Sequence, residues 1–324
     1  ASPIPWVDIL RLPGDAKGEA SVVRGGEWRG RRLVELATEG IPVWAARLGG
    51  VYVVIGGAGG IGEAWSAHMI DTYGAQIIWI GRRALNADIE ARLDRLAELG
   101  PRPVYIMTDA TDRSALKATY AWIREQFGAV HGVVHSALVL RDRSIATMEF
   151  EDFRASLEVK DTISVRIAEV FDPRDMDFVL FFSSMQSFGM SPGQSNYVAG
   201  CTFVDAFADA LRAHWNVPIK VMNWGYWGSI GSVARGDYRE RMARSGVGSI
   251  EPEMGIAALD QLMSGPWNQL AFLKLSESQS DLGVEKQVLN PQRHGSLLEA
   301  LTFNLALIPT GDDASVSGGE SSAT

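Results

Sequence analysis

The sequence contains almost no cysteine, no long hydrophobic run and no excess of positive charge. Cys201 is the single cysteine among 324 residues, so a disulfide within the chain is excluded, which fits the reducing cytoplasm. No apolar stretch approaches about twenty residues and no charged-then-apolar signal segment opens the chain, so we expect no membrane anchor. The formal net charge of −9 argues against a general binder of nucleic acids or anionic membranes.

An initiator methionine is also missing, since the chain opens with Ala1, and we interpret the chain as a fragment or a processed product. What is present is typical of a soluble protein with a substantial core, because 46% of the residues are hydrophobic and 21% are charged. A length of 324 residues suits a single large α/β unit with flanking segments.

From Val51 onward, short apolar runs alternate with amphipathic stretches of helical length. The apolar runs are Val51–Ile55, Gln76–Ile80, Pro103–Met107, Val130–His135, Asp177–Phe182, Pro218–Asn223 and Gln269–Leu273. The helix-like stretches include Asn86–Leu99, Asp112–Phe127, Phe150–Phe171 and Asn196–Trp215. Strands of a parallel sheet read as continuous apolar runs because helices cover both faces. The pattern therefore predicts an α/β fold, a Rossmann-like doubly wound parallel seven-stranded sheet with helices on both faces.

Three segments fall outside this alternation. Ala20–Ala37 could form two strands around a glycine pair, whereas Gly228–Glu253 contains glycine and arginine, follows a strand end and could be a mobile lid. Gly311–Thr324 has the composition of a disordered linker. We therefore divide the chain into an N-terminal segment, a central α/β unit and a C-terminal extension, with the boundaries 1–49, 50–278 and 279–324.

A glycine-rich turn joins the first predicted strand to the helix-compatible stretch that follows it. It reads Gly56-Gly57-Ala58-Gly59-Gly60-Ile61-Gly62. Glycine lets the backbone turn sharply and approach a pyrophosphate closely, and the following helix presents free N–H groups and partial positive charge to the phosphates. We expect this turn to bind a dinucleotide, and the alternative is a tight strand–helix turn with no ligand.

Two arginines at the end of the second predicted strand bear on the choice of dinucleotide. No acidic residue stands there to bind the ribose of NAD, whereas Arg82 and Arg83 suit the 2′-phosphate of NADP. We therefore expect NADPH as the cofactor, with solvated loop arginines as the alternative. After the third predicted strand, Asp109 could bind the adenine amino group or cap the next helix.

Three residues distant in the sequence could form a catalytic group. Ser184 closes the strand that begins near Asp177, Tyr197 opens a helix-like stretch, and Lys160 lies in the long helix before both. Taken singly, each residue has another interpretation. The lysine could be solvated, the serine could cap a turn or helix, and the tyrosine could belong to the core.

Four segments resemble the ketoreductase domains of modular polyketide synthases, which belong to the short-chain dehydrogenase/reductase superfamily. They are GGAGGIG, VVHSA, FVLFFSSMQSFGMSPGQSNY and VMNWGYWG, and the resemblance runs from about Val51 to about Leu275. It implies that Lys160, Ser184 and Tyr197 are catalytic, and it implies no metal site. To the expected NADPH site it adds residues that follow the third and fourth strands, namely Ala110, Ser136 and Ala137.

Chemistry gives each of these catalytic residues a role. Hydride transfer to a ketone builds negative charge on its oxygen, which requires a proton donor and further hydrogen-bond donors. Tyr197 would donate the proton, and Lys160 would lower the pKa of that tyrosine and hydrogen-bond the cofactor ribose. Ser184 would orient and polarise the substrate carbonyl.

Cys201 departs from the family pattern. By resemblance it occupies a fourth catalytic position, four residues after the tyrosine, that is usually Asn. A thiol is a weaker hydrogen-bond donor than an amide and lacks the amide carbonyl, so any relay through that position would be altered. We expect Cys201 to be buried rather than reactive, and reduced reductase activity stays open.

Two positions bear on the configuration of the product. Family members that form the D-hydroxyl usually carry Leu-Asp-Asp after the fourth strand, and here the matching residues are Leu140, Arg141 and Asp142. Members that form the L-hydroxyl usually have Trp where Gly189 stands. The resemblance therefore implies the D-configured, B-type product with Asp142 in stereocontrol, and a simple loop charge is the alternative.

The resemblance also implies a partner. The substrate would be a 3-oxoacyl thioester on the phosphopantetheine arm of an acyl carrier protein, an acidic protein. Candidate docking residues, unless they are solvated, are the arginines Arg141, Arg143, Arg235, Arg239, Arg241 and Arg244. Family members pair the catalytic half with an N-terminal structural half, of which residues 1–49 would be a short remnant.

The leading interpretation is an NADPH-dependent reductase of carrier-bound 3-oxoacyl chains that works beside other synthase domains. A free-standing short-chain reductase of a diffusible ketone is a second hypothesis. A third is a catalytically silent scaffold that binds cofactor and holds its neighbours, which only Cys201 favours.

Overall fold

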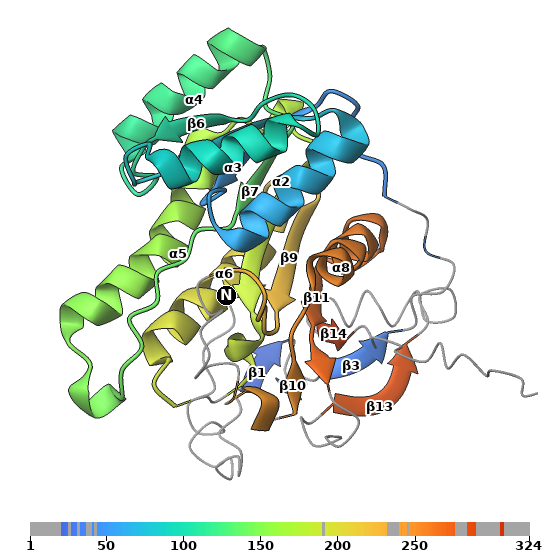
Figure 1. Ribbon diagram of the computed structural model, residues 1–324. Coiled ribbons are helices and arrows are strands. Elements are labelled where there is room, and N and C mark those ends of the chain that lie inside the picture. Colours follow the sequence, from blue (N-terminus) through green and yellow to red (C-terminus); the bar gives the residue numbers. More distant parts are fainter. Residues whose placement is uncertain are drawn as a thin grey trace, which may run out of the picture.

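The computed structural model describes residues 21–24, 27–30, 33–36, 41, 44–189, 192–231, 240, 242–244, 246–275, 284–289 and 305–307. Figure 1 shows a twisted sheet running through the molecule with helices on both of its faces. In the part of the chain thus described, no helix is long and apolar enough to cross a membrane.

A ten-stranded sheet forms the centre of the fold, and all of its neighbouring strands are parallel. Its order is β13 (Val284–Leu289), β3 (Leu33–Leu36), β14 (Leu305–Leu307), β11 (Gln269–Phe272), β9 (Ile219–Trp224), β8 (Phe178–Ser184), β7 (Gly132–His135), β4 (Val51–Ile55), β5 (Gln76–Gly81) and β6 (Val104–Met107). The seven strands from β11 to β6 are the predicted ones, so the predicted Rossmann-like sheet is confirmed.

The sheet continues beyond the predicted seven strands. β3, β13 and β14 lie in the segments 1–49 and 279–324, and they extend the edge formed by β11. The division of the chain into three parts stays a prediction, although strands from both flanking parts join the central sheet. The two strands expected in Ala20–Ala37 are β1 (Ser21–Arg24) and β2 (Glu27–Gly30), which pair antiparallel. A further short pair joins β10 (Val247–Gly248) to β12 (Lys274–Leu275).

Within the described residues, six α-helices cover the sheet, three on each face. On one face lie α2 (Gly60–Tyr73), α3 (Ala87–Ala97) and α8 (Pro252–Ser264). On the other face lie α4 (Arg113–Phe127), α5 (Phe150–Val170) and α6 (Ser195–Arg212). The helices α3 to α6 match the four predicted ones. Helix α8 was not predicted, and it begins with Pro252, inside the segment expected to be a lid; residues 232–239, 241 and 245 of that segment lie outside the described ones.

Two hydrophobic clusters sandwich the sheet, because side chains alternate along each strand. On β4, Tyr52 and Val54 face the cluster under α2, α3 and α8, whereas Val51, Val53 and Ile55 face the cluster under α4, α5 and α6. All five side chains are buried, which explains why the strand reads as a continuous apolar run.

Candidate active site

The strand order reverses between β4 and β7, and ligands of doubly wound folds bind beyond the carboxyl ends of the strands at this point. Two cavities of about 530 and 370 Å³ lie there. Both are lined in part by Ile61, Ser136, Leu138 and Gly231, so the two adjoin each other. The larger cavity borders the glycine-rich turn after β4.

Most glycines of that turn are required by the protein's own packing. Gly56 has a positive φ of 86°, and a Cβ there would lie 2.6 Å from the backbone of Ala137. A Cβ on Gly57 would lie 2.1 Å from the ring of Trp79, and one on Gly62 would lie 2.9 Å from the Cα of Gly57. These three residues would be glycine in a ligand-free turn as well.

Gly59 is different, because packing does not require it. It is exposed, it precedes the first residue of α2 without a side-chain cap, and an added Cβ would meet only the carbonyl oxygen of Gly56, at 3.2 Å. Both Gly59 and Gly60 line the larger cavity. The missing side chain therefore leaves the N-terminus of α2 open to a phosphate, which fits the expected pyrophosphate.

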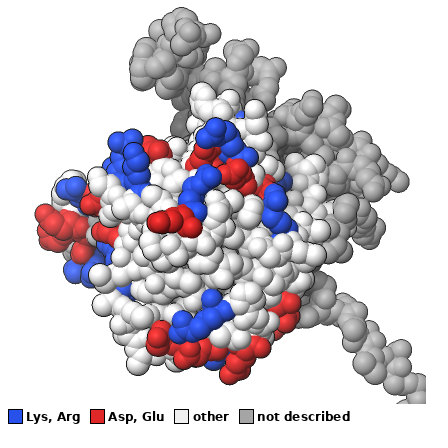
Figure 2. Space-filling model, turned by 90° about the horizontal axis from the view of Figure 1, so that it is seen from above, with Lys and Arg blue, Asp and Glu red and all other residues white. Residues whose placement is uncertain are grey.

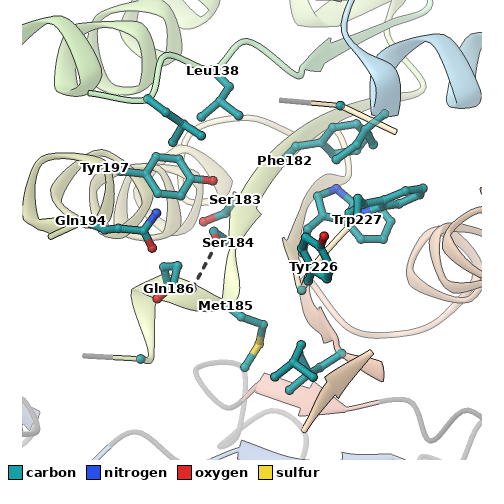
Figure 3. Close-up of a pocket in the computed structure, with 18 of the residues that line it drawn as sticks. Leu138, Phe182, Ser183, Ser184, Met185, Gln186, Gln194, Tyr197, Tyr226 and Trp227 are labelled. Atoms are coloured by element: carbon teal, nitrogen blue, oxygen red, sulfur yellow. Dashed lines mark hydrogen bonds between the residues drawn. The ribbon is translucent and has the colours of Figure 1, made fainter. Parts of the chain in front are cut away.

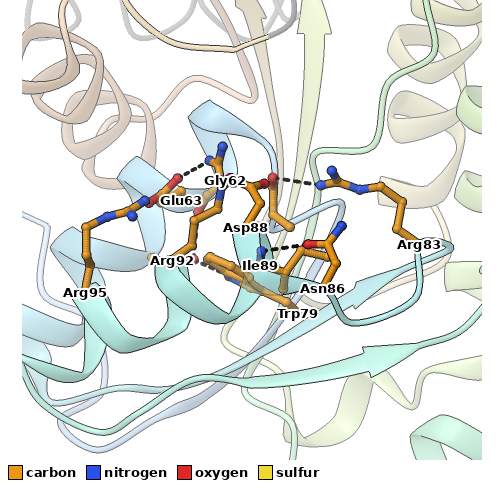
Figure 4. Close-up of polar contacts among 11 residues, drawn as sticks. Gly62, Glu63, Trp79, Arg83, Asn86, Asp88, Ile89, Arg92 and Arg95 are labelled. Carbon is orange, nitrogen blue, oxygen red and sulfur yellow. Dashed lines mark hydrogen bonds and ion pairs between the residues drawn. The ribbon is translucent and has the colours of Figure 1, made fainter.

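Arginines border the same cavity where β5 ends. Arg82 and Arg83 are exposed and line it, and Arg83 donates a 3.3 Å hydrogen bond to the carbonyl oxygen of Ala58 in the glycine turn. Arg92 of α3, which the sequence did not single out, also lines the cavity and pairs with Glu63 and Asp88 (Figure 4). Its signal would have been helical spacing, since it lies one turn after Asp88.

Asp109 lines this cavity, but it does not cap the next helix. Its Oδ1 accepts hydrogen bonds from the backbone N–H and the hydroxyl of Thr111. The cap of α4 is Asp112, whose carboxylate accepts from the N–H groups of Ser114 and Ala115. The capping alternative for Asp109 is therefore wrong, because Asp112 stands directly before the helix. The remaining expected cofactor residues on this wall are Ala58, Ile61, Ala110, Ser136 and Ala137.

The smaller cavity brings together Lys160, Ser184 and Tyr197. Figure 3 shows the Tyr197 phenol pointing into it from the side of α6, toward the end of β8 that carries Ser184. Close packing of α5 and α6 places the lysine there, because a Cβ on Gly200 would lie 2.8 Å from the Cβ of Lys160.

Lys160 is buried, with 3% of its surface exposed, so the solvated-lysine interpretation is wrong. Its ammonium donates a 2.7 Å hydrogen bond to the carbonyl oxygen of Phe182. Burial lowers the pKa of Lys160, and the nearby Cys201 and Asp205 oppose that shift.

Ser184 makes the capping contact that one of its two interpretations expected. It ends β8, and its Oγ accepts a 3.2 Å hydrogen bond from the N–H of Gln186, which caps the short 3₁₀ helix Met185–Ser187. Accepting this bond uses one lone pair and leaves the hydroxyl proton available. The capping bond therefore holds the side chain on the cavity wall without consuming its donor.

Cys201 is fully buried behind Tyr197 and does not line the cavity. Burial raises the pKa of its thiol to about 11, against the opposing effect of the Lys160 ammonium. The thiol is therefore protonated at neutral pH, so it is no thiolate nucleophile, and its expected burial is confirmed.

Asp142 reaches the cavity through another residue. Its side chain is exposed and does not line the wall, but its carboxylate accepts a 2.7 Å hydrogen bond from the amide of Gln194. Gln194 is 4% exposed and lines the cavity beside Tyr197, as Figure 3 shows. Gln194 was not among the residues expected at the site; its position directly before α6 was the available signal. Gly189 also lines the wall.

The expected docking arginines are only partly described. Arg143 pairs with Asp152 at 2.8 Å, and the exposed Arg244 pairs with Glu240 at 3.4 Å. Arg141 contributes its carbonyl oxygen to a hydrogen bond from Asn196. On the face seen in Figure 2, basic and acidic side chains lie intermixed. Outside the described residues lie Arg235, Arg239 and Arg241.

The KR domain family matches residues 50–229. The chain belongs to this family, the ketoreductase domains of polyketide synthases. It is 46% identical to the polyketide synthase PksN of Bacillus subtilis over 92% of its own length, and 43% identical to PksM of the same organism over 93%. These matches cover 6% of PksN and 7% of PksM, so the chain spans a small part of its curated relatives.

Solved structures of ketoreductases share the fold. A ketoreductase domain from the bacillaene assembly line is 27% identical with a TM-score of 0.68, and the match covers 77% of this chain and 61% of that one. A structure of A-type ketoreductases from a modular polyketide synthase is 28% identical with a TM-score of 0.72, covering 81% and 56%. This ketoreductase domain is therefore an oxidoreductase by family.

Proposed function

We propose that this domain uses NADPH to reduce the 3-oxo group of an acyl thioester, carried on the phosphopantetheine arm of an acyl carrier protein, to the D-configured 3-hydroxyacyl thioester. The observation that carries the proposal is that Lys160, Ser184 and Tyr197 line one cavity, which adjoins the cavity at the glycine-rich turn. NADPH bound along that turn would supply the hydride.

The cofactor would be held by the residues that fit its charged groups. The open N-terminus of α2 at Gly59 and Gly60 would take the pyrophosphate, and Arg82 and Arg83 would take the 2′-phosphate. Asp109 would accept a hydrogen bond from the adenine amino group.

The reacting carbonyl would lie between two donors. Ser184 donates its hydroxyl proton in a hydrogen bond to the carbonyl oxygen, which polarises the carbonyl and fixes its orientation. Tyr197 transfers its phenolic proton to the same oxygen as negative charge develops, so a hydride and a proton together convert ketone to alcohol. The buried ammonium of Lys160 stabilises the phenolate that the transfer leaves.

Residues at the cavity and neighbouring protein domains would bind and present the acyl substrate. Gln194, held by Asp142, borders the cavity beside the tyrosine and would select which face of the ketone meets the hydride. Because the relatives PksN and PksM are far longer than this chain, neighbouring synthase domains and a carrier protein are the proposed partners. Arg141, Arg244 and the other candidate arginines would bind the acidic carrier protein. We also assign the domain to the cytoplasm.

One experiment tests this function. NADPH oxidation is followed with a 3-oxoacyl-pantetheine thioester for the parent chain and for Tyr197→Phe, and NADPH binding is measured separately by fluorescence. Loss of the general acid should lower kcat at least about 100-fold without weakening NADPH binding. Tyr120→Phe on the outer helix α4 is the matched control and should keep the parent kcat.

Each alternative has its own outcome in this experiment. A parent that binds NADPH but turns over no thioester would be a scaffold. A parent that prefers a simple diffusible ketone to the thioester would be a free-standing reductase. Chirality of the product decides the proposed configuration.

A further inference from the structure

A buried polar cluster lies directly behind Ser184, between β8, β9 and α6. We call it the polar hub, and it consists of Ser183, Ser187, Asp205 and Asn223, none more than 8% exposed. Buried polar groups are costly unless they are paired, so a fully connected cluster at this place needs a reason beyond packing.

Asp205 and Asn223 connect the hub. The Asn223 side-chain amide nitrogen lies 3.1 Å from a carboxylate oxygen of Asp205 and 3.0 Å from the carbonyl oxygen of Ser184. Gln269 donates a 2.8 Å hydrogen bond to the Asn223 side-chain oxygen, which orients the amide nitrogen toward the carboxylate. The Ser187 hydroxyl lies 2.8 Å from both the Asp205 carboxylate and the Ser184 carbonyl oxygen.

These contacts fix the end of β8. The Ser184 carbonyl oxygen is held by the Asn223 amide and the Ser187 hydroxyl, and Asn223 also lies 3.1 Å from the Ser183 hydroxyl. Because the backbone of Ser184 is held from behind, its side chain keeps its place on the cavity wall. Asp205 is the charged member of the hub, and charged acceptors make the stronger hydrogen bonds.

Asp205 also belongs to the surroundings of Lys160. On α6, Tyr197, Cys201 and Asp205 follow one another at four-residue spacing and therefore share one face of the helix. Lys160 approaches α6 from α5 beside Gly200, and its ammonium interacts electrostatically with Cys201 and Asp205.

The groups around the Lys160 ammonium differ in charge. From α6 come the Tyr197 phenol, the Cys201 thiol and the Asp205 carboxylate, from β8 the Phe182 carbonyl oxygen, and from β7 the imidazole of His135. Burial raises the pKa of Cys201 to about 11, and burial holds the pKa of His135 well below its ordinary value. Both are therefore uncharged at neutral pH, and Asp205 carries the negative charge in this set.

We propose that Asp205 is a positioning residue of the reductase site, whose buried carboxylate fixes the Ser184 end of β8 and supplies the negative charge behind the Lys160 ammonium. The proposal rests on the proposed function, since it gives those two side chains their roles. It also gives the buried Lys160 ammonium an acidic partner where the fourth catalytic position is a neutral thiol.

The variant Asp205→Asn tests it, because the side chain keeps its size and can still join the hub. We expect kcat to fall on the order of 10- to 100-fold, since the site loses part of its alignment, with KM for the thioester nearly unchanged. Removal of the negative charge makes both the lysine cation and the protonated tyrosine easier to deprotonate. The alkaline limb of the kcat profile should therefore move to lower pH by about one unit.

Two further variants separate this role from a structural one. Asp209→Asn removes a carboxylate one turn further along α6, where it pairs with Arg212, and should change neither kcat nor the pH profile. The double variant Asp205→Asn, Asn223→Asp returns a carboxylate to the hub. It should restore part of the lost kcat and shift the alkaline limb of the kcat profile part of the way back to the parent's pH. Thermal denaturation of each variant confirms that it is folded.

A readout without turnover keeps the two proposals distinguishable. NMR titration of the ¹⁵N-labelled Lys160 ammonium should give a lower pKa in Asp205→Asn than in the parent, whether or not the parent reduces the thioester. An unchanged lysine titration, or lost activity with an unmoved alkaline limb, would make Asp205 merely structural and overturn this inference. A parent that turns over no thioester would overturn the proposed function instead.

Discussion

The ammonium of Lys160 donates a 2.7 Å hydrogen bond to the carbonyl oxygen of Phe182, two residues before Ser184 on the same strand. The cation is thereby attached to the strand that carries the serine hydroxyl. A shift of one side chain would move the other through the backbone of β8, so the two proposed catalytic groups share one rigid support.

The first prediction concerns this lysine. Lys160→Met keeps the length of the side chain but removes the cation, so we expect kcat for thioester reduction to fall by at least about 100-fold. Lys220→Met is a matched control, because Lys220 is also buried and donates to the carbonyl oxygens of Gly265 and Trp267, away from the cavity. Both variants are assayed at a temperature where each is folded. Equal losses of kcat in the two would contradict a special role for Lys160.

A second prediction concerns the choice of cofactor. Arg82→Ala and Arg83→Ala should each raise KM for NADPH by about 10- to 100-fold, the value of a charged hydrogen bond to phosphate, and leave KM for NADH unchanged. Arg95→Ala is the control, since Arg95 pairs with Glu63 and does not line the cavity. An equal rise of KM for NADPH and NADH would show that these arginines do not recognise the 2′-phosphate.

The sequence was sufficient for those features of the fold that depend on local pattern. Buried parallel strands are apolar throughout, so β4 and its neighbours could be recognised from single segments. The strands β3, β13 and β14 could not be recognised in this way. They have only four, six and three residues, and such short segments become strands by pairing with strands distant in the sequence.

In the site, too, some residues could be predicted from the sequence and others could not. Spacing and family pattern indicated Lys160, Ser184 and Tyr197, but they did not indicate that Gln194 reaches the cavity in place of Asp142. Nor did they indicate Asp205, whose partners come from the 3₁₀ helix after β8 and from β9. Hydrogen bonds between side chains far apart in the sequence leave no periodic signal.

The third prediction tests how Asp142 acts on configuration. Asp142→Ala removes the acceptor that holds Gln194, so the amide would turn freely beside the substrate, and we expect the excess of D-product to fall by about tenfold. Asp142→Asn retains an oxygen acceptor and should retain most of the excess. Chiral chromatography of the 3-hydroxyacyl product gives the ratio. If the alanine variant keeps the parent's ratio, Asp142 is a loop charge.

The last prediction concerns the far wall of the cavity, which includes a residue from the N-terminal segment. Leu33 of β3 lines the cavity, and it packs with Leu273, Met185 and Phe188 in a small apolar cluster. This wall would contact the hydrocarbon part of a bound acyl chain. In such a contact each methylene changes the free energy of transition-state binding by about 1–3 kcal/mol.

Leu33→Trp fills part of this space and should lower kcat/KM for a long 3-oxoacyl thioester at least about tenfold relative to a short one. Leu33→Ala should shift the same ratio the opposite way. Leu36→Ala on the same strand is the control, because Leu36 is 2% exposed and belongs to the core cluster rather than to the cavity wall. It should lower the thermal stability and leave the chain-length ratio unchanged, since the lost packing does not reach the substrate. If the ratio of kcat/KM for long and short thioesters changed with the thermal stability of the variants and not with the substitution at the cavity wall, β3 would have no part in substrate selection.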